Sequence, residues 1–152
     1  MNNELYMKKC ILLAKESEAK EEIPVGALLT QNNIILSESY NLQIRKNDPT
    51  AHAEINVIID ACNKINNYRI GNSILYTTLE PCLMCIGAIC EARINRVVFG
   101  AYADNDDEKN FLEKFNYIKN KYNLDHTPEF IGGILQEECS LIIKNFFKTK
   151  RS

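Results

Sequence analysis

Apolar residues recur along this chain at two spacings, one typical of helices and the other of strands. In residues 4–19 they recur every three or four positions, which predicts an amphipathic helix. The residues of its predicted inner face are Tyr6, Cys10, Leu13, Ala14 and Ser17. Asn3 is a candidate cap for this helix, because its side-chain oxygen can accept a hydrogen bond from a free N–H group of the first turn.

Short runs of mainly apolar residues, rich in β-branched side chains, predict strands. Their ranges are 25–30, 34–40, 73–78, 96–100 and 129–131. A short polar turn separates the first two, so we expect an antiparallel hairpin.

Helical spacing returns in four later segments. They are residues 53–66, residues 83–92, a segment that follows an acidic loop at 104–108, and residues 136–148. The predicted inner face of residues 53–66 is Ile55, Ile58, Ile59 and Cys62. That of the segment after the acidic loop is Phe111, Phe115, Ile118 and Tyr122, and that of residues 136–148 is Cys139, Ile142, Ile143 and Phe146. A polar stretch, 41–50, leads into the first of these helices.

The order of these elements predicts the fold class. A strand at 73–78, a helix at 83–92 and a strand at 96–100 form a unit that places the two strands in parallel, joined by a right-handed crossover. Together with the hairpin, this predicts a mixed sheet of about five strands with helices on both faces, an α/β fold. The length of 152 residues fits one domain, so we treat 1–152 as a single unit.

Composition and charge exclude several classes of protein. The chain is 45% hydrophobic and 25% charged, which is typical of a folded domain and excludes disordered and collagen-like chains. It has no run of about 18 apolar residues and no secretory signal, so we expect a cytoplasmic protein without membrane association, with its cysteines reduced. The formal net charge of −2 argues against a broad nucleic-acid-binding surface, although a local basic patch remains open.

Two short motifs carry the residue types of a metal site. The first is His52 followed by Ala53 and Glu54, and the second is Pro81 with cysteines at 82 and 85. On a helix, Cys82 and Cys85 would lie on one face, and a helix start favours the thiolate form that binds metal. Pro81 suits the first turn, where its missing N–H costs nothing.

Three protein ligands on zinc would leave one coordination position for water, as catalytic zinc sites do. Glu54 is a candidate general acid and base beside that position. On a regular helix, however, two residues correspond to a rotation of about 200°. His52 and Glu54 can therefore face the same point only where the helix start is irregular.

Other interpretations of these residues remain open. A Cys-x-x-Cys pair can be a redox motif or half of a structural zinc site, and His-x-Glu alone is weak evidence. The remaining cysteines lie on apolar helix faces and are predicted as core residues. They are Cys10, Cys62, Cys90 and Cys139. His126 falls in a predicted loop, where we expect a surface or hydrogen-bonding role.

Taken together, these motifs and their flanking segments resemble the bacterial tRNA-specific adenosine deaminases of the zinc-dependent cytidine deaminase superfamily, over nearly the full chain. The matching segments are 24–27 (Pro-Val-Gly-Ala), 47–54 (Asn-Asp-Pro-Thr-Ala-His-Ala-Glu), 67–69 (Asn-Tyr-Arg), 75–82 (Leu-Tyr-Thr-Thr-Leu-Glu-Pro-Cys), 96–101 (Arg-Val-Val-Phe-Gly-Ala), 133–135 (Gly-Ile-Leu), 138–139 (Glu-Cys) and 146–147 (Phe-Phe). The two metal motifs identify only the superfamily, whereas the Asp-Pro-Thr-Ala run and the Phe-Phe tail indicate the tRNA branch.

The resemblance implies a cytidine-deaminase-like three-layer α/β/α fold and one zinc ion per chain, held by His52, Cys82 and Cys85. It implies hydrolysis of the amine at C6 of adenosine 34 in a tRNA anticodon stem-loop, which gives inosine, with Glu54 as the catalytic group that moves protons. It also implies a homodimer.

The resemblance also names residues around the substrate. Asn41 would hydrogen-bond the flipped-out base, and Val25, Ala53 and Phe147 would line its surroundings. Val25 and Phe147 could equally be plain core residues.

One segment departs from the family pattern. After residue 101 the family usually carries an Asp, a Lys and a Gly-rich loop, where this chain has an acidic segment without glycine. Four carboxylates at 104–108 would repel an RNA backbone, unless the loop is a plain solvated turn. A tRNA substrate would then need basic residues elsewhere. The candidates are Arg45, Lys46, Lys144, Lys148, Lys150 and Arg151.

Two alternatives therefore stand beside tRNA deamination. A free-base or nucleotide deaminase, acting on guanine or cytosine, would keep the whole metal site and would suit the acidic loop. A zinc-stabilised binding module without catalysis would need a fourth protein ligand, and the sequence offers no spare residue at ligand spacing.

Overall fold

Five strands form one mixed sheet, in the order β2-β1-β3-β4-β5, in the computed structural model, which describes residues 2–103 and 106–151. They are β1 (Gly26–Gln31), β2 (Ile34–Tyr40), β3 (Ser73–Leu79), β4 (Arg96–Ala101) and β5 (Glu129–Ile131). β1 pairs antiparallel with β2 and β3, whereas β3, β4 and β5 are parallel. The predicted α/β fold, the hairpin and the parallel pair are confirmed, and each strand lies within one residue of its predicted bounds.

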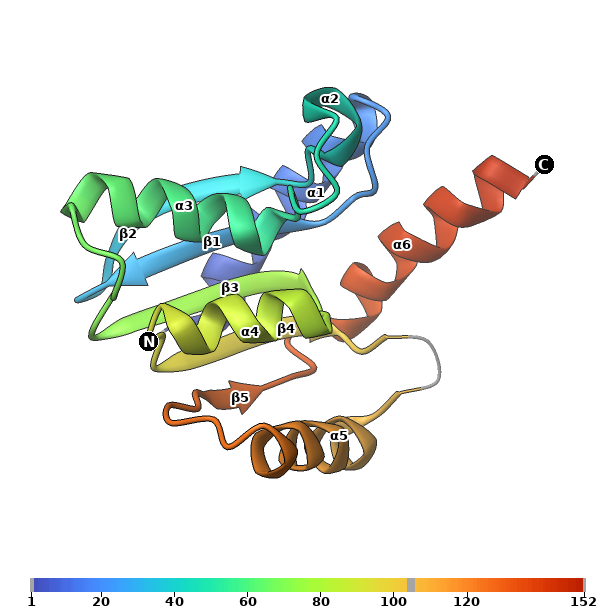
Figure 1. Cartoon of the computed structure of the whole chain (residues 1–152). Coiled ribbons are helices and arrows are strands. Elements are labelled where there is room, and N and C mark those ends of the chain that lie inside the picture. Colours follow the sequence, from blue (N-terminus) through green and yellow to red (C-terminus); the bar gives the residue numbers. More distant parts are fainter. Residues whose placement is uncertain (1, 104–105, 152) are drawn as a thin grey trace.

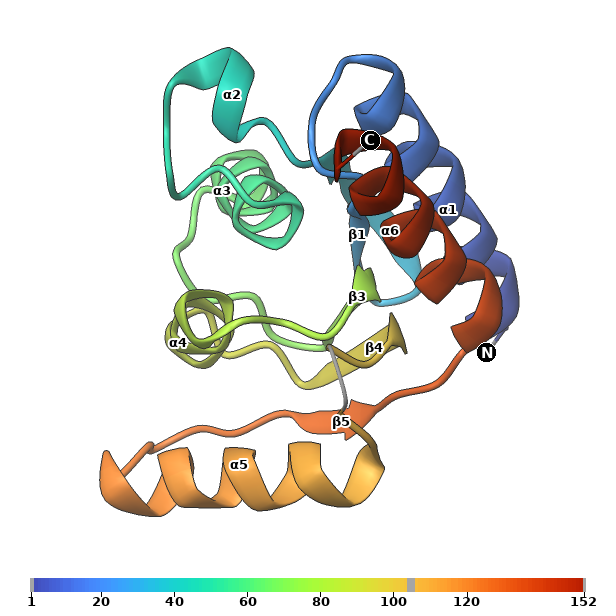
Figure 2. The same ribbon diagram turned by 90° about the vertical axis from the view of Figure 1, so that its right-hand side faces the viewer.

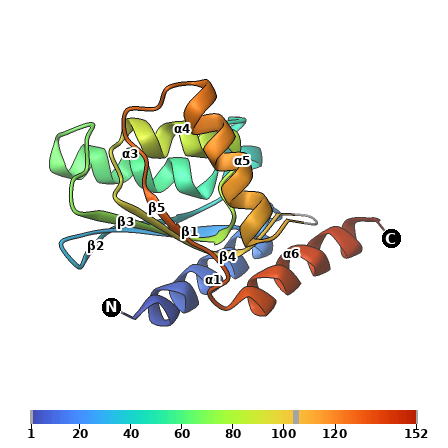
Figure 3. The ribbon, with the colours of Figure 1, turned by 90° about the horizontal axis from the view of Figure 1, so that it is seen from below.

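Helices cover both faces of this sheet (Figure 1). They are α1 (Asn3–Ala19), α2 (Gln43–Lys46), α3 (Ala53–Ile65), α4 (Leu83–Glu91), α5 (Glu108–Lys121) and α6 (Gln136–Arg151). Helices α1 and α6 lie side by side on one face, and α3, α4 and α5 cover the other (Figures 2 and 3). The result is the three-layer α/β/α arrangement implied by the resemblance.

Alternation along the strands supplies a hydrophobic core to each face. Leu28, Tyr76 and Val98 point toward α1 and α6, whereas their neighbours along the strands point toward α3, α4 and α5. The neighbours are Ala27, Leu29, Leu75, Val97 and Phe99. Gly26 sits where β1 touches α1, because a Cβ there would lie 2.1 Å from the carbonyl oxygen of Cys10. Both layers are thus packed tightly against a buried sheet.

The first helix differs from its prediction at the cap. Asn2, and not Asn3, is the cap residue, and its Oδ1 accepts a hydrogen bond of 3.0 Å from the N–H of Leu5. The inner face is also rotated slightly, since Met7 and Ile11 are buried whereas Tyr6 and Leu13 are only half-buried.

The stripe predicted for α3 is wrong for Ile59, whereas Cys62 packs against the core and Ile55 is half-buried. Only Ile58 is buried, whereas Ile59 is 52% exposed. The buried residues are Ala53, Glu54, Asn56, Val57, Ile58 and Ala61. Small and polar side chains occupy the inner face because α3 packs against β1 and β2 there and carries the site described below. Tyr122 is likewise wrong as an inner residue of α5, since it is the C-cap and 67% exposed.

The four cysteines predicted as core residues are all free thiols. Cys10, Cys90 and Cys139 are buried, whereas Cys62 is only half-buried. His126 hydrogen-bonds the carbonyl oxygen of Ile94 through Nε2 at 2.7 Å, as expected for a loop histidine. Within the described residues, no helix combines the length and the hydropathy needed to cross a membrane.

Candidate metal centre and active site

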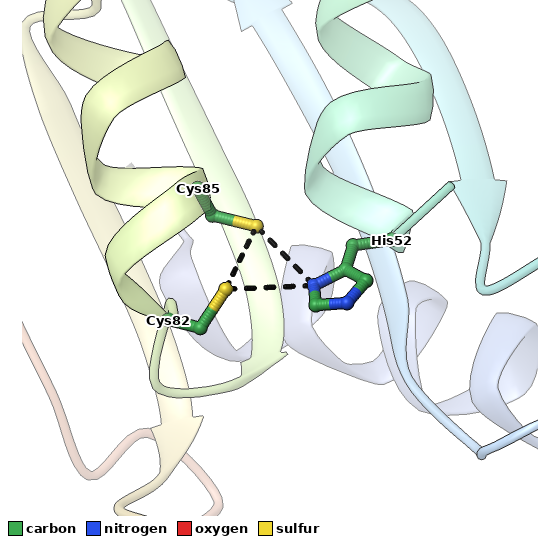
Figure 4. Close-up of side chains that lie close together, drawn as sticks. All are labelled: His52, Cys82 and Cys85. Carbon is green, nitrogen blue, oxygen red and sulfur yellow. Dashed lines mark hydrogen bonds between the residues drawn. The ribbon is translucent and has the colours of Figure 1, made fainter. Parts of the chain in front are cut away.

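The two helix starts predicted to carry metal ligands meet at one edge of the sheet (Figure 4). His52 is the N-cap of α3 and Cys82 is the N-cap of α4, both with extended backbone. Cys85 lies within the first turn of α4 and is fully buried. Nδ1 of His52 and both sulfur atoms point at one another, so the structure brings all three predicted ligands together.

The distances among these atoms suit a tetrahedral zinc site. The two sulfur atoms are 3.7 Å apart, and each lies 3.6 Å from Nδ1 of His52. Sulfur at about 2.3 Å and nitrogen at about 2.0–2.1 Å from zinc give about 3.8 Å between two sulfurs and about 3.6 Å between sulfur and nitrogen at tetrahedral angles. The arrangement therefore fits zinc without any movement of the side chains. Among the described residues the group has these three members, so a fourth coordination position remains.

The backbone explains how His52 and Glu54 reach the same point. Because His52 precedes the helix with φ −67° and ψ 152°, the rotation of about 200° expected for a regular helix does not apply to this pair. The predicted place of Pro81 is wrong by two positions. It lies just before the N-cap and not in the first turn. At that position its ring restricts the backbone of the preceding residue, Glu80.

Electrostatics at the two thiols follow from their contact and burial. The hydrogen bond between the sulfurs lowers the pKa of Cys82 to about 5, and the same bond together with burial raises the pKa of Cys85 well above its usual range. One proton is thus shared unequally between the two cysteines. Zinc binding would displace that proton, because coordination by a divalent cation stabilises both thiolates.

Glu54 lies beside the ligand group without belonging to it. The residue is 4% exposed, and Thr77 of β3 donates a hydrogen bond of 3.2 Å to its Oε1. Burial raises the pKa of the Glu54 carboxyl above its ordinary value. A buried carboxyl of this kind, hydrogen-bonded by Thr77 and also by Cys85, is suited to accepting and returning protons.

A cavity of about 230 Å³ opens beside this centre. Its walls include Asn41, Val25 and Phe147, which the resemblance places around a base, together with His52 and Glu54. Phe147 is 40% exposed, so it is a wall of the cavity and not a core residue. Val25 serves both the cavity and the core.

Ala53 differs from the other three residues named by the resemblance. Its side chain is fully buried in the core under α3, and it is not among the described residues that line the cavity. Any contact of Ala53 with a base would come from its backbone.

Sequence reasoning missed several residues of the cavity. They are Ile23, Gln43, Leu79, Glu80 and Ile143. It also missed α2 and the residue that holds it, Glu22, whose buried carboxylate accepts hydrogen bonds from the N–H groups of Ile44 and Arg45. The only signal in the sequence was that a charged residue, Glu22, lies two positions before Pro24. That signal is too weak to interpret. Glu22 thus fixes α2, which begins with Gln43, and the segment before it that carries Asn41.

The acidic segment has structural partners where it is described. Asp107 is the N-cap of α5 and accepts a hydrogen bond of 2.8 Å from the N–H of Asn110, and Asp106 is paired with Lys114. Glu108 lies in the first turn, where a negative charge is favourable. Asp104 lies outside the described residues. The described part of the segment is thus the start of a helix, in which Asp106 is paired with a lysine whereas Asp107 and Glu108 are exposed to solvent.

The basic residues predicted to contact RNA are exposed where the structure describes them. Lys144, Lys148 and Lys150 are exposed on α6, which also carries Phe147 of the cavity, and Arg45 and Lys46 end α2. The side chain of Arg151 lies outside the described part of the chain. Both groups of basic residues therefore belong to elements that border the cavity.

Comparison with known proteins agrees with this geometry. Residues 1–101 match the cytidine and deoxycytidylate deaminase zinc-binding region. The tRNA-specific adenosine deaminase of Haemophilus influenzae is 43% identical over 150 residues, covering 98% of this chain and 85% of that protein. A structure from work on A-to-I editing by tRNA:A34 deaminases at the wobble position of transfer RNA is 33% identical, with a TM-score of 0.81 over 90% of this chain and 97% of that chain. The guanine deaminase of Bacillus subtilis is 32% identical, with a TM-score of 0.64 over 99% and 94%.

Proposed function

The chain belongs to the cytidine and deoxycytidylate deaminase family, and on this basis we propose that it deaminates adenosine 34 in a tRNA anticodon to inosine. The observation that carries the proposal is a cavity lined by His52, Cys82 and the buried Glu54, at a group of three ligand atoms whose mutual distances fit a zinc site. Nearly full-length similarity to a tRNA-specific adenosine deaminase supports the choice of adenosine in tRNA.

A zinc ion held by His52, Cys82 and Cys85 would lower the pKa of a water that attacks C6 of the base. Glu54 accepts a proton from that water and delivers it to the ring nitrogen, and it then moves the proton of the new C6 hydroxyl to the amino group, which leaves as ammonia. The hydrogen bond from Thr77 holds the Glu54 carboxyl in one orientation through these transfers. One carboxyl thus acts first as a base and then as an acid.

Recognition of the base falls to the cavity walls. Nδ2 of Asn41 donates to Oε1 of Gln43 at 3.3 Å, which fixes the orientation of the amide and leaves its oxygen as a hydrogen-bond acceptor. Val25 and Phe147 provide apolar surface on which a flat ring can pack. The backbone of Ala53, at the start of α3, is the remaining contact expected. Since the cavity takes a single ring system, the base must leave its stack to enter.

RNA binding would rest on basic residues of the two helices that border the cavity. Lys144, Lys148 and Lys150 are exposed on α6, which contributes Phe147 to the cavity, and Arg45 and Lys46 are exposed on α2, which contributes Gln43. They give an anticodon stem-loop a local basic surface on a chain whose formal net charge is −2. We expect the reaction to take place in the cytoplasm. We also expect residues 1–152 to form a single domain.

A homodimer is part of the proposal. On α4, Ile86, Ile89 and Cys90 pack into the chain's own core, whereas Leu83 is 63% exposed. Ile59 on the neighbouring α3 is 52% exposed. Apolar side chains exposed on adjacent helices favour association. Light scattering should give twice the chain mass of 17.4 kDa, and a stable monomer would contradict this part of the proposal.

Deamination of a free base such as guanine is the second candidate function. The observation in its favour is the 32% identity to a guanine deaminase, which nearly equals the 33% identity to the tRNA deaminase structure. The 43% identity to the tRNA-specific adenosine deaminase of Haemophilus influenzae over 98% of this chain favours the tRNA substrate.

Ammonia release decides between the two functions. The protein is incubated in parallel with an anticodon stem-loop bearing A34, the same stem-loop bearing G34, and free guanine, cytosine and adenine. We expect ammonia and inosine from the A34 stem-loop alone. Release from guanine or cytosine without reaction of the stem-loop would replace the proposal with the second candidate.

A further inference from the structure

A lysine outside the metal centre joins two carboxylates near the cavity. Nζ of Lys114 on α5 lies 2.7 Å from Oε2 of Glu80 and 2.9 Å from Oδ2 of Asp106. The side chain of Glu80 is 3% exposed, whereas that of Lys114 is 49% exposed. Lys114 therefore reaches from the surface to a buried carboxylate, which is costly to bury without a partner.

Glu80 is tied to the segment after β4 as well as to α5. Its Oε1 accepts a hydrogen bond of 2.9 Å from the N–H of Ala103, and its own N–H donates to the carbonyl oxygen of Ala101 at 2.8 Å. Pro81 alone separates it from Cys82. The Glu80 carboxylate thus connects the chain segment just before the metal ligand Cys82 with the end of β4 and the residues that follow β4.

This carboxylate also stands where two cavities meet. Glu80 lines the cavity of about 230 Å³ at the metal centre, and Ala103 and Asp106 line a neighbouring cavity of about 410 Å³. Both cavities share the side chains of Leu79, Ile143 and Phe147. Lys114 thus binds Glu80 and Asp106 directly and Ala103 through Glu80, and each of these three residues lines one of the two cavities.

We propose that Lys114 is a positioning residue that, through Glu80 and Asp106, fixes the wall between these two cavities and so shapes the binding site for RNA next to the reacting base. This inference rests on the proposed function and assigns residues that shape its substrate site. Without the lysine, the Glu80 carboxylate would turn toward water, and the N–H of Ala103 would lose its acceptor. The reacting atoms are untouched, so substrate binding and not the chemical step should suffer.

The test compares Lys114→Met with Lys119→Met, an exposed lysine on the same helix. For Lys114→Met we expect KM for the stem-loop to rise about tenfold with kcat within about threefold, because displaced binding groups mainly weaken binding. Zinc content should match that of the parent, and the amide of Ala103 should exchange its hydrogen faster by NMR. Lys114→Arg should restore KM, because its guanidinium can still pair with both carboxylates.

A double variant separates positioning from general loss of stability. Glu80→Gln removes the buried charge and keeps an acceptor for Ala103, so adding it to Lys114→Met should bring KM and the amide exchange back toward the parent. A KM for Lys114→Met within twofold of the parent, an equal rise in Lys119→Met, or a loss of zinc in step with activity would overturn the proposal. Failure of the tRNA assignment is distinguishable, since the parent itself would then leave the stem-loop unreacted while the exchange of Ala103 still reports on the pair.

Discussion

The buried carboxyl of Glu54 and the three metal ligands are separate parts of one site, so they can be perturbed separately. Glu54 is fixed by Thr77 and by the first turn of α3, and it does not belong to the ligand group. Removing its carboxyl should therefore leave the metal in place. This separation gives a test of the proton-transfer role.

Glu54→Ala should keep zinc and fold but lose nearly all turnover, by about 10²–10⁴-fold, because general acid–base groups contribute that much. Glu54→Gln is the matched control, since it keeps the shape of the side chain and also cannot accept the proton. Deaminase rate and zinc content measured on the same samples check both statements. A rate within threefold of the parent would remove Glu54 from the mechanism, and loss of zinc would make it a ligand.

Cys82→Ser and Cys85→Ser should each lose most of the zinc, because a hydroxyl oxygen is a far poorer ligand for zinc than a thiolate. Cys90→Ser serves as the control, since Cys90 is a buried thiol of the same helix outside the ligand group. Metal analysis of the purified variants should give about one zinc per chain for the control and the parent. Full zinc in both Cys82→Ser and Cys85→Ser would show that the assignment is wrong.

Spacing in the sequence was enough to predict His52, Cys82 and Cys85 as one group, because each of the two motifs opens a helix. It was not enough to show how Glu54 joins them, since that depends on the extended backbone at position 52. Glu22 and Glu80 could not be predicted at all. Their partners are supplied by segments far away in the chain, and nothing local marks the meeting.

At the scale of elements, strands were easier to predict than helix faces. β1, β3 and β4 are buried on both faces, so their apolar runs are continuous and their bounds are plain. On α3, the bulky apolar residue Ile59 is exposed whereas Ala61 and Glu54 face inward. The inner face was predicted from the spacing of bulky apolar residues. On α3, close packing against the sheet and the presence of the site both favour small or polar residues on the inner face.

The start of α5 gives a test at this scale. Asp107→Ala should reduce the free energy of unfolding by about 1 kcal/mol, because the N–H of Asn110 loses its cap. Asp107→Asn should be nearly neutral for stability, since Asn caps equally well, and should bind an RNA stem-loop slightly more tightly than the parent because one negative charge is gone. Urea unfolding and stem-loop binding of both variants check this. Equal destabilisation by Ala and Asn would contradict the capping role.

On the scale of the whole molecule, the distribution of charge matters more than its sum. The charges behind the formal net charge of −2 are unevenly distributed. Asp106 is paired with Lys114, which it shares with Glu80, whereas Lys144, Lys148 and Lys150 are exposed along α6. A stem-loop approaching the cavity would therefore meet the basic helix first. The acidic segment repels it less than the four carboxylates in the sequence suggest.

Charge reversal on α6 tests whether the molecule holds RNA in this way. Lys148→Glu combined with Lys150→Glu should raise the Kd for an anticodon stem-loop and flatten its salt dependence, because the slope falls by about one for each phosphate that is no longer neutralised. Lys119→Glu with Lys121→Glu, at the far end of α5, is a control of equal charge. Binding measured at two salt concentrations separates direct phosphate binding from the effect of net charge, since the control shifts both measurements only slightly. If the α6 variant binds as tightly as the parent while free guanine is deaminated, the tRNA assignment fails, and the small-substrate function takes its place.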